Sequence, residues 1–92
     1  MDPQDIGKKT SFTMFNEDGT KSTITLEKHV ADALHTIGNV HGFIQETYNK
    51  VSLLKPHLTS MQKGDVVRDL ALVKAKETPA YKKYMNDLRN SL

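Results

Sequence analysis

Hydrophobic and polar residues alternate in two short runs near the start of the chain. The first run covers residues 10–15 and the second covers residues 21–26, and a period of two is typical of strands with one buried face. Asp18-Gly19 lies between the runs, and this dipeptide between alternating segments favours a β-hairpin. The pattern therefore predicts an N-terminal hairpin.

A three-residue loop at 17–19, with Gly19 in the left-handed region, sets the register of this hairpin. The expected cross-strand pairs are Phe15 with Lys21, Thr13 with Thr23, and Phe12 with Ile24. One face then carries apolar side chains. The other face carries hydroxyl and basic side chains, and its second-strand members are Lys21, Thr23 and Thr25.

From Glu27 onward the period changes from two to that of a helix, with no loop between the two patterns. The apolar positions that define this period are Val30, Leu34, Ile37, Val40, Ile44, Tyr48, Val51 and Leu54. Gly38 and Asn39 favour two helices, with Gly38 as the C-terminal cap of the first and Asn39 as the N-cap of the second. The unbroken apolar period leaves one long helix over 27–55 as the alternative.

The C-terminal part of the chain predicts two further helices. Residues 59–64 contain Thr, Ser and Gly and predict a loop, after which Asp65 is expected to cap a helix that runs to about Lys76. Thr78 and Pro79 predict the start of the last helix, since threonine is a good N-cap and proline suits the first helical position.

Composition narrows the class of protein. The chain has 92 residues, 37% of them hydrophobic and 26% charged, which suits one folded domain. Cysteine is absent, so disulfide and thiolate chemistry are excluded. No apolar run approaches the roughly 20 residues that span a bilayer, and the acidic, polar start at 1–5 is unlike a signal peptide. We expect a cytoplasmic protein that does not associate with membranes.

The net charge of +2 hides an asymmetry between the two halves of the chain. Residues 1–49 carry a net charge of −3, and residues 50–92 carry +5. A basic half is suggestive of an anionic partner, although lysines on solvated helix faces produce the same distribution.

Catalytic and metal-binding patterns are not evident. The histidines lie at 29, 35, 41 and 57, without the i, i+4 spacing that places two metal ligands on one helix face. No glycine-rich phosphate loop follows a strand, and no serine lies in the strained turn that activates a nucleophile. We therefore expect no enzyme activity, cofactor, metal or small-molecule substrate.

The segment Thr23-Ile-Thr-Leu26, followed by apolar residues at helical spacing, resembles the ribbon-helix-helix superfamily of bacterial and plasmid DNA-binding proteins. The matching helical positions are Val30, Leu34 and Ile37, then Val40, Ile44 and Thr47 or Tyr48. Members of this superfamily are intertwined homodimers that pair one strand from each subunit and insert the ribbon into the major groove of double-stranded DNA. They include repressors and accessory factors of plasmid DNA processing.

The resemblance assigns roles to particular residues. It implies that Lys21, Thr23 and Thr25 face the DNA groove. It also implies that the N-terminus of the second helix, at Asn39, Val40 and His41, holds a DNA phosphate. The small core and the exposed strand edge also predict a stable homodimer whose interface uses Ile24, Leu26, Val30, Leu34 and Ile44, which a single subunit is expected not to cover fully.

The expected fold is mainly α with a short β-ribbon, an α+β fold of ribbon-helix-helix type. Residues 1–9 are expected to form a flexible arm, residues 10–55 the DNA-binding and dimerisation region, and residues 56–92 a C-terminal helical extension of the same domain. The strand at 10–15 is not required by the superfamily. It either pairs with the free edge of the ribbon or replaces the partner's strand.

Two functions follow from this pattern. The first is sequence-specific DNA binding as a homodimer, in a transcriptional repressor or a DNA-processing accessory factor. The alternative is a small helical protein-interaction module without nucleic-acid binding, in which Thr23 and Thr25 are only part of a solvated sheet face.

Overall fold

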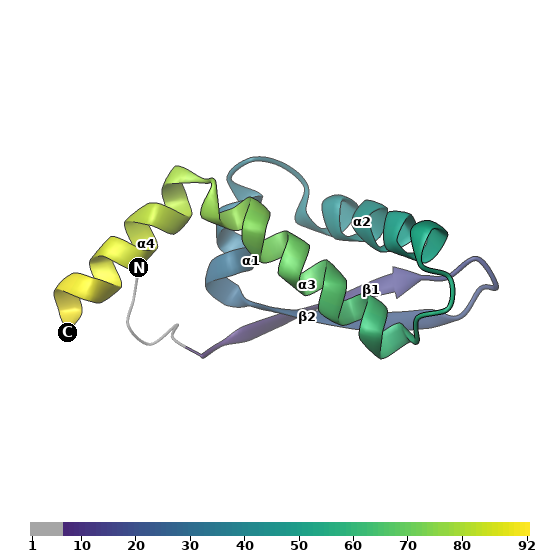
Figure 1. Ribbon diagram of the computed structural model, residues 1–92. Helices are drawn as coiled ribbons and strands as arrows, with labels where there is room; N and C mark the ends of the chain where they lie inside the picture. Colours follow the sequence, from purple (N-terminus) through teal and green to yellow (C-terminus); the bar gives the residue numbers. More distant parts are fainter. Residues whose placement is uncertain (1–6) are drawn as a thin grey trace.

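The computed structural model describes residues 7–92 and has an α+β fold, with an N-terminal hairpin followed by helices (Figure 1). This confirms the expected fold class, and an antiparallel ribbon followed by helices is compatible with a ribbon-helix-helix arrangement. The elements are β1 (Lys9–Phe15), β2 (Lys21–Glu27), α1 (Lys28–His35), α2 (Val40–Leu54), α3 (Ser60–Lys76) and α4 (Pro79–Ser91). Of the arm expected at 1–9, residues 1–6 lie outside the described residues and Lys9 already belongs to β1.

The turn between the strands has the geometry that the sequence predicts. Gly19 has a φ of 87°, its N–H donates to the Asn16 carbonyl at 3.1 Å, and the Asn16 N–H donates to Thr20 at 2.9 Å. This is a three-residue loop with a left-handed glycine. The register is therefore the expected one, with Phe15 opposite Lys21 and Thr13 opposite Thr23.

All the helices that contact the hairpin cover the same face of it (Figure 1). Met14, Ile24 and Leu26 point into the helical layer and are buried, whereas their neighbours on the opposite face are mostly exposed. The helices complete the core with Val30, Ala31, Ala33, Leu34, Val40, Ile44, Tyr48, Val51, Val67, Ala71 and Ala75. Because successive residues of a strand point to opposite sides, the hairpin has a core face packed on the helices and an opposite, free face.

The sequence between Glu27 and Leu54 forms two helices. Asn39 caps α2, and its side chain accepts a hydrogen bond from Gly42 N–H at 3.0 Å, as predicted. Thr36 caps the end of α1 in place of Gly38, because the chain keeps a right-handed conformation there. Ile37 is half exposed in the connecting loop, so the apolar period that suggested one long helix is interrupted at that residue.

The α1 helix begins without any loop after β2. Glu27 is the last residue of β2 and also the N-cap of α1, with extended backbone angles. The change of period seen in the sequence is therefore a direct junction between strand and helix.

The prediction that Asp65 starts the third helix was wrong. The α3 helix starts at Ser60 behind a capping box, in which Thr59 accepts from Gln62 N–H and the Gln62 side chain accepts from Thr59 N–H. Gly64 lies inside this helix and is buried where α3 crosses β2. A glycine expected in a loop instead lets a helix approach a strand closely.

The start of the last helix is as expected. The Thr78 hydroxyl accepts from Tyr81 N–H at 3.1 Å, and Pro79 occupies the first turn of α4. The α4 helix rests on α1 through aromatic contact, since the rings of His29 and Tyr84 stack with centroids 4.3 Å apart. Within residues 7–92, no helix has both the length and the apolar character needed to cross a membrane.

The residues expected between two subunits are covered within one chain. Ile24, Leu26, Val30, Leu34 and Ile44 are between 0 and 5% exposed. The expectation that a single subunit could not cover them was wrong, because residues beyond the family resemblance, above all those of α3, complete this core. A dimer has to use a different surface.

Gly64 yields a stability prediction. Gly64→Ala should raise the free energy of unfolding by about 0.5–1 kcal/mol, because alanine favours the helix and its methyl meets Ile24 and Arg68 at ordinary contact distances of 3.9 and 3.6 Å. Gly64→Leu should lower it, because the larger side chain collides with Ile24. Urea unfolding followed by circular dichroism measures both changes. A destabilised Gly64→Ala variant would contradict the spacing of α3 and β2.

Candidate nucleic-acid interface

The free face of the hairpin carries polar side chains except at Phe15, next to the turn. The residues of β1 on this face are Lys9, Ser11, Thr13 and Phe15, and those of β2 are Lys21, Thr23, Thr25 and Glu27. Hydroxyl groups occupy the middle of the face, where the Ser11 and Thr25 oxygens lie 3.0 Å apart across the strands. We call these eight residues the ribbon face.

Three of the predicted DNA-contacting residues lie together on the ribbon face. Lys21 and Thr23 are exposed and Thr25 is partly covered. They follow each other at every second residue of β2, as the alternating pattern predicts. In contrast to the superfamily, the second strand of the ribbon is β1 of the same chain.

Side chains of α2 close the part of the outer β1 edge that lies next to the turn, at Thr13 and Phe15. The Gln45 amide accepts from Phe15 N–H at 2.9 Å and donates to the Phe15 carbonyl at 3.2 Å. One turn earlier, His41 Nε2 lies 2.8 Å from the Thr13 carbonyl oxygen and can donate to it. These contacts occupy backbone groups that would otherwise be available to a further strand.

Among the residues that the structure describes, none closes the outer edge of β2. Two backbone hydrogen bonds mark the ends of the β1–β2 ladder: Asn16 N–H donates to the Thr20 carbonyl, and Lys28 N–H donates to the Lys8 carbonyl. Because these bonds join even-numbered residues, the even-numbered residues of β2 are the ones whose backbone groups pair with β1. The backbone groups of its odd-numbered residues point away from β1. No hydrogen bond from another described residue reaches this edge.

A polar network holds the turn against α2. The buried Tyr48 hydroxyl donates to Asn16 Oδ1 at 2.7 Å. The Asn16 amide in turn donates to the Thr20 and Ser22 hydroxyls at 2.9 and 3.2 Å. The turn end of the ribbon is therefore fixed to the helical layer by hydrogen bonds as well as by apolar packing.

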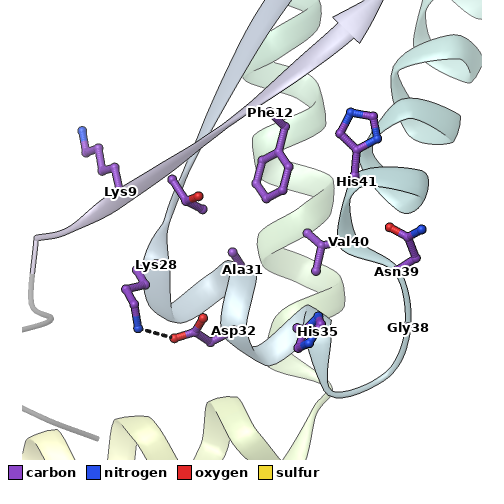
Figure 2. A pocket seen from close by; sticks show the side chains of 11 residues that line it. Lys9, Phe12, Lys28, Ala31, Asp32, His35, Gly38, Asn39, Val40 and His41 are labelled. Carbon is purple, nitrogen blue, oxygen red and sulfur yellow. Dashed lines mark hydrogen bonds and ion pairs between the residues drawn. The ribbon is translucent and has the colours of Figure 1, made fainter.

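The other predicted contact residues lie at the N-terminus of α2, in a groove of about 810 Å³ (Figure 2). Asn39 is engaged in capping, Val40 is buried, and His41 reaches β1. The backbone N–H groups at the start of α2 and the side-chain NH2 of Asn39 could hold a phosphate, whereas the Val40 side chain could not contact a ligand outside the core.

The groove also gathers basic side chains that the sequence did not connect with α2. Its lining includes Lys9 from β1, and Lys28 and His35 from α1. Lys28 pairs with Asp32 at 2.8 Å, so its charge is partly balanced. Lys21, Thr23 and Thr25 do not line the groove. The two predicted sets therefore occupy separate surfaces, and the His41 contact with Thr13 links the N-terminus of α2 to the margin of the ribbon.

Sequence reasoning missed the role of Gln45. Its spacing of four from His41 places both side chains on one face of α2, but nothing local indicates that this face meets a strand edge. No group of three or more potential metal ligands occurs in the part of the chain that the structure describes.

The chain matches no family profile, no curated protein and no solved structure. The ribbon face, the outer edge of β2 and the groove are therefore the features from which a function can be inferred.

The turn predicts a pH dependence of stability. Hydrogen bonds from the Thr20 hydroxyl and the Thr20 N–H, 2.6 and 3.0 Å long, hold the pKa of Asp18 below its ordinary value. The contribution of the ionised Asp18 to the free energy of unfolding should be complete above the unfolded-state pKa of about 3.9. It should be lost as the pH falls through the lower folded-state pKa. Asp18→Asn keeps the acceptor without titrating. Its urea midpoint should therefore fall less than that of the parent between about pH 6 and about pH 3. Equal decreases would contradict this prediction.

Proposed function

We propose that the protein binds double-stranded DNA in a sequence-specific manner through the ribbon face. The observation that carries this proposal is the ribbon itself, which has a helical layer on one side and a face of hydroxyl and lysine side chains on the other. A two-stranded ribbon fits the major groove, which is about 12 Å wide. The role that suits such binding is that of a repressor or a DNA-processing accessory factor.

The chemistry of the β2 side chains suits the edges of base pairs. Lys21 can donate to guanine, and Thr23 and Thr25 can hydrogen-bond a base or contact a thymine methyl group. Successive members lie about 6.6 Å apart along the strand, or about two base-pair steps of 3.4 Å. The Thr25 hydroxyl is partly engaged by Ser11, so Lys21 and Thr23 are the more accessible readers.

The groove at the start of α2 suits the DNA backbone. His41 brings the α2 N-terminus to the outer edge of β1, and a DNA strand would pass this margin when the ribbon enters the major groove. Free N–H groups at Val40 and His41 would then face phosphate oxygens.

The proposed active form is a homodimer joined at the open edge of β2. An antiparallel pairing of β2 with β2 of a second copy has its twofold axis perpendicular to the sheet, so both ribbon faces point the same way. The two β2 strands would lie in the groove about 4.8 Å apart, each flanked on its other side by β1 of its own chain. This arrangement needs none of the apolar residues that each chain already buries.

The ribbon face is tested by replacing Lys21, Thr23 and Thr25 together with alanine. The variant should keep its fold, because none of the three belongs to the buried core. It should lose about 1–3 kcal/mol of binding free energy for each base contact removed, together with base preference at those positions. Fluorescence anisotropy with duplexes selected from a randomised pool measures this loss. Lys82→Ala, which removes an exposed charge on α4, is the control and should preserve base preference.

Unchanged affinity and preference in a folded triple variant would mean that the ribbon face is not the reader. The protein-interaction alternative would then be the better account. One observation favours this alternative: Val66, Leu70 and Val73 form an exposed apolar stripe along α3, at spacings of four and three residues.

The dimer is tested by two substitutions at Thr23. The N–H of Thr23 points away from β1, so Thr23→Pro should leave the hairpin paired but remove an edge donor, giving a monomer. Thr23→Ala keeps that N–H and should remain dimeric while losing base preference. Analytical ultracentrifugation of both variants and the parent separates the two roles. A monomeric parent at tens of micromolar, or a dimeric Thr23→Pro variant, would contradict pairing through β2.

A further inference from the structure

Phe15 is an exposed aromatic residue in an otherwise polar face. Its side chain is 53% exposed at the turn end of the ribbon face, although a phenylalanine ordinarily gains free energy by being buried. The alternating pattern places it outward, because Met14 and Phe12 take the core-facing positions of β1. Core packing therefore does not account for this aromatic ring.

The backbone of Phe15 is held unusually well for an exposed residue at the end of a strand. Gln45 binds both its N–H and its carbonyl oxygen, and the Gln45 amide also donates to Asn49 Oδ1 at 2.9 Å. The next residue, Asn16, is fixed by the buried Tyr48 hydroxyl. The ring is thus presented from a fixed backbone, which reduces the conformational entropy lost when it meets a partner.

The ring is paired with a cationic donor. Lys21 lies directly opposite Phe15, and its Nζ is 5.7 Å from the centre of the ring, within the range of a cation–π contact. The apolar ring of Phe15 and the ammonium group of Lys21 therefore project side by side from neighbouring strands. Thr13 and Thr23 form the next outward pair along the ribbon.

We infer that Phe15 is a specificity-determining residue that contacts the C5-methyl group of a thymine, beside the base that Lys21 contacts. The inference rests on the proposed DNA binding and adds a reader on β1 to those on β2. The thymine methyl is the apolar group that base pairs present in the major groove, and phenylalanine is one of the side chains that suit it. A phosphate, by contrast, would suit Lys21 but not the ring.

The test combines a substitution in the protein with the removal of a single methyl group from the DNA. The probe is a duplex that the parent protein recovers from a randomised pool, in which each thymidine is replaced in turn by deoxyuridine, which lacks only the methyl. At one thymine position in each half of the symmetric DNA site, replacement by deoxyuridine should lower the affinity of the parent protein about three- to tenfold. Phe15→Ala should bind the thymine duplex more weakly by a similar factor and show no further loss with deoxyuridine at that position.

Two further variants separate direct contact from an indirect effect. Phe15→Leu keeps an apolar side chain and should retain part of the sensitivity to deoxyuridine. Lys21→Ala should weaken binding but leave that sensitivity in place. If Phe15 acted only by positioning Lys21, Phe15→Ala would lose guanine preference while keeping the thymine effect, and the inference would be wrong. Circular dichroism and sedimentation of each variant verify that fold and dimer persist.

Failure of this inference can be distinguished from failure of the proposed function. If the parent recovers duplexes but no thymine methyl shows coupling to Phe15, the inference is overturned and DNA binding stands. If the parent recovers no duplex, DNA binding itself is wrong and the inference fails with it.

Discussion

The contacts of Gln45 and His41 with the outer edge of β1 determine how the rest of the molecule can be used. A two-stranded sheet has two edges, and an unprotected edge is a site for pairing with another chain. Here α2 supplies side-chain groups in the place of a third strand on one side. Among the residues that the structure describes, none makes such contacts with the β2 edge, which is therefore the longer stretch of strand edge left for pairing with another strand. Since the helices cover one face of the sheet, the opposite face is the one whose side chains stay exposed.

Much of the local structure could be predicted because its causes are local. Asp18-Gly19 set the turn and hence the register, Asn39 and Thr78 cap the helices they precede, and the period of two gives the exposure of Lys21 and Thr23. The start of α3 was missed although Thr59 and Gln62 have capping-box spacing. Gly64 and Asp65 suggested a loop and a cap, and their true surroundings depend on where α3 crosses β2.

The parts of the candidate site that could not be predicted depend on long-range contacts. Gln45 meets Phe15 across 30 residues of sequence, and Lys9 joins His35 in the groove only because β1 and α1 are packed together. The self-contained core has the same origin, since the small residues Ala71 and Ala75 allow α3 to lie close to the rest of the chain. A family pattern confined to 21–54 carries no information on that packing.

The direct junction at Glu27 has a mechanical consequence. Because the last residue of β2 is also the cap of α1, no loop is present to absorb a change in the twist of the strand. A change in the twist of β2 is therefore expected to turn α1 with it. The stacked rings of His29 and Tyr84 extend that linkage to α4. The strand, α1 and α4 are therefore expected to move together, because no flexible segment separates β2 from α1.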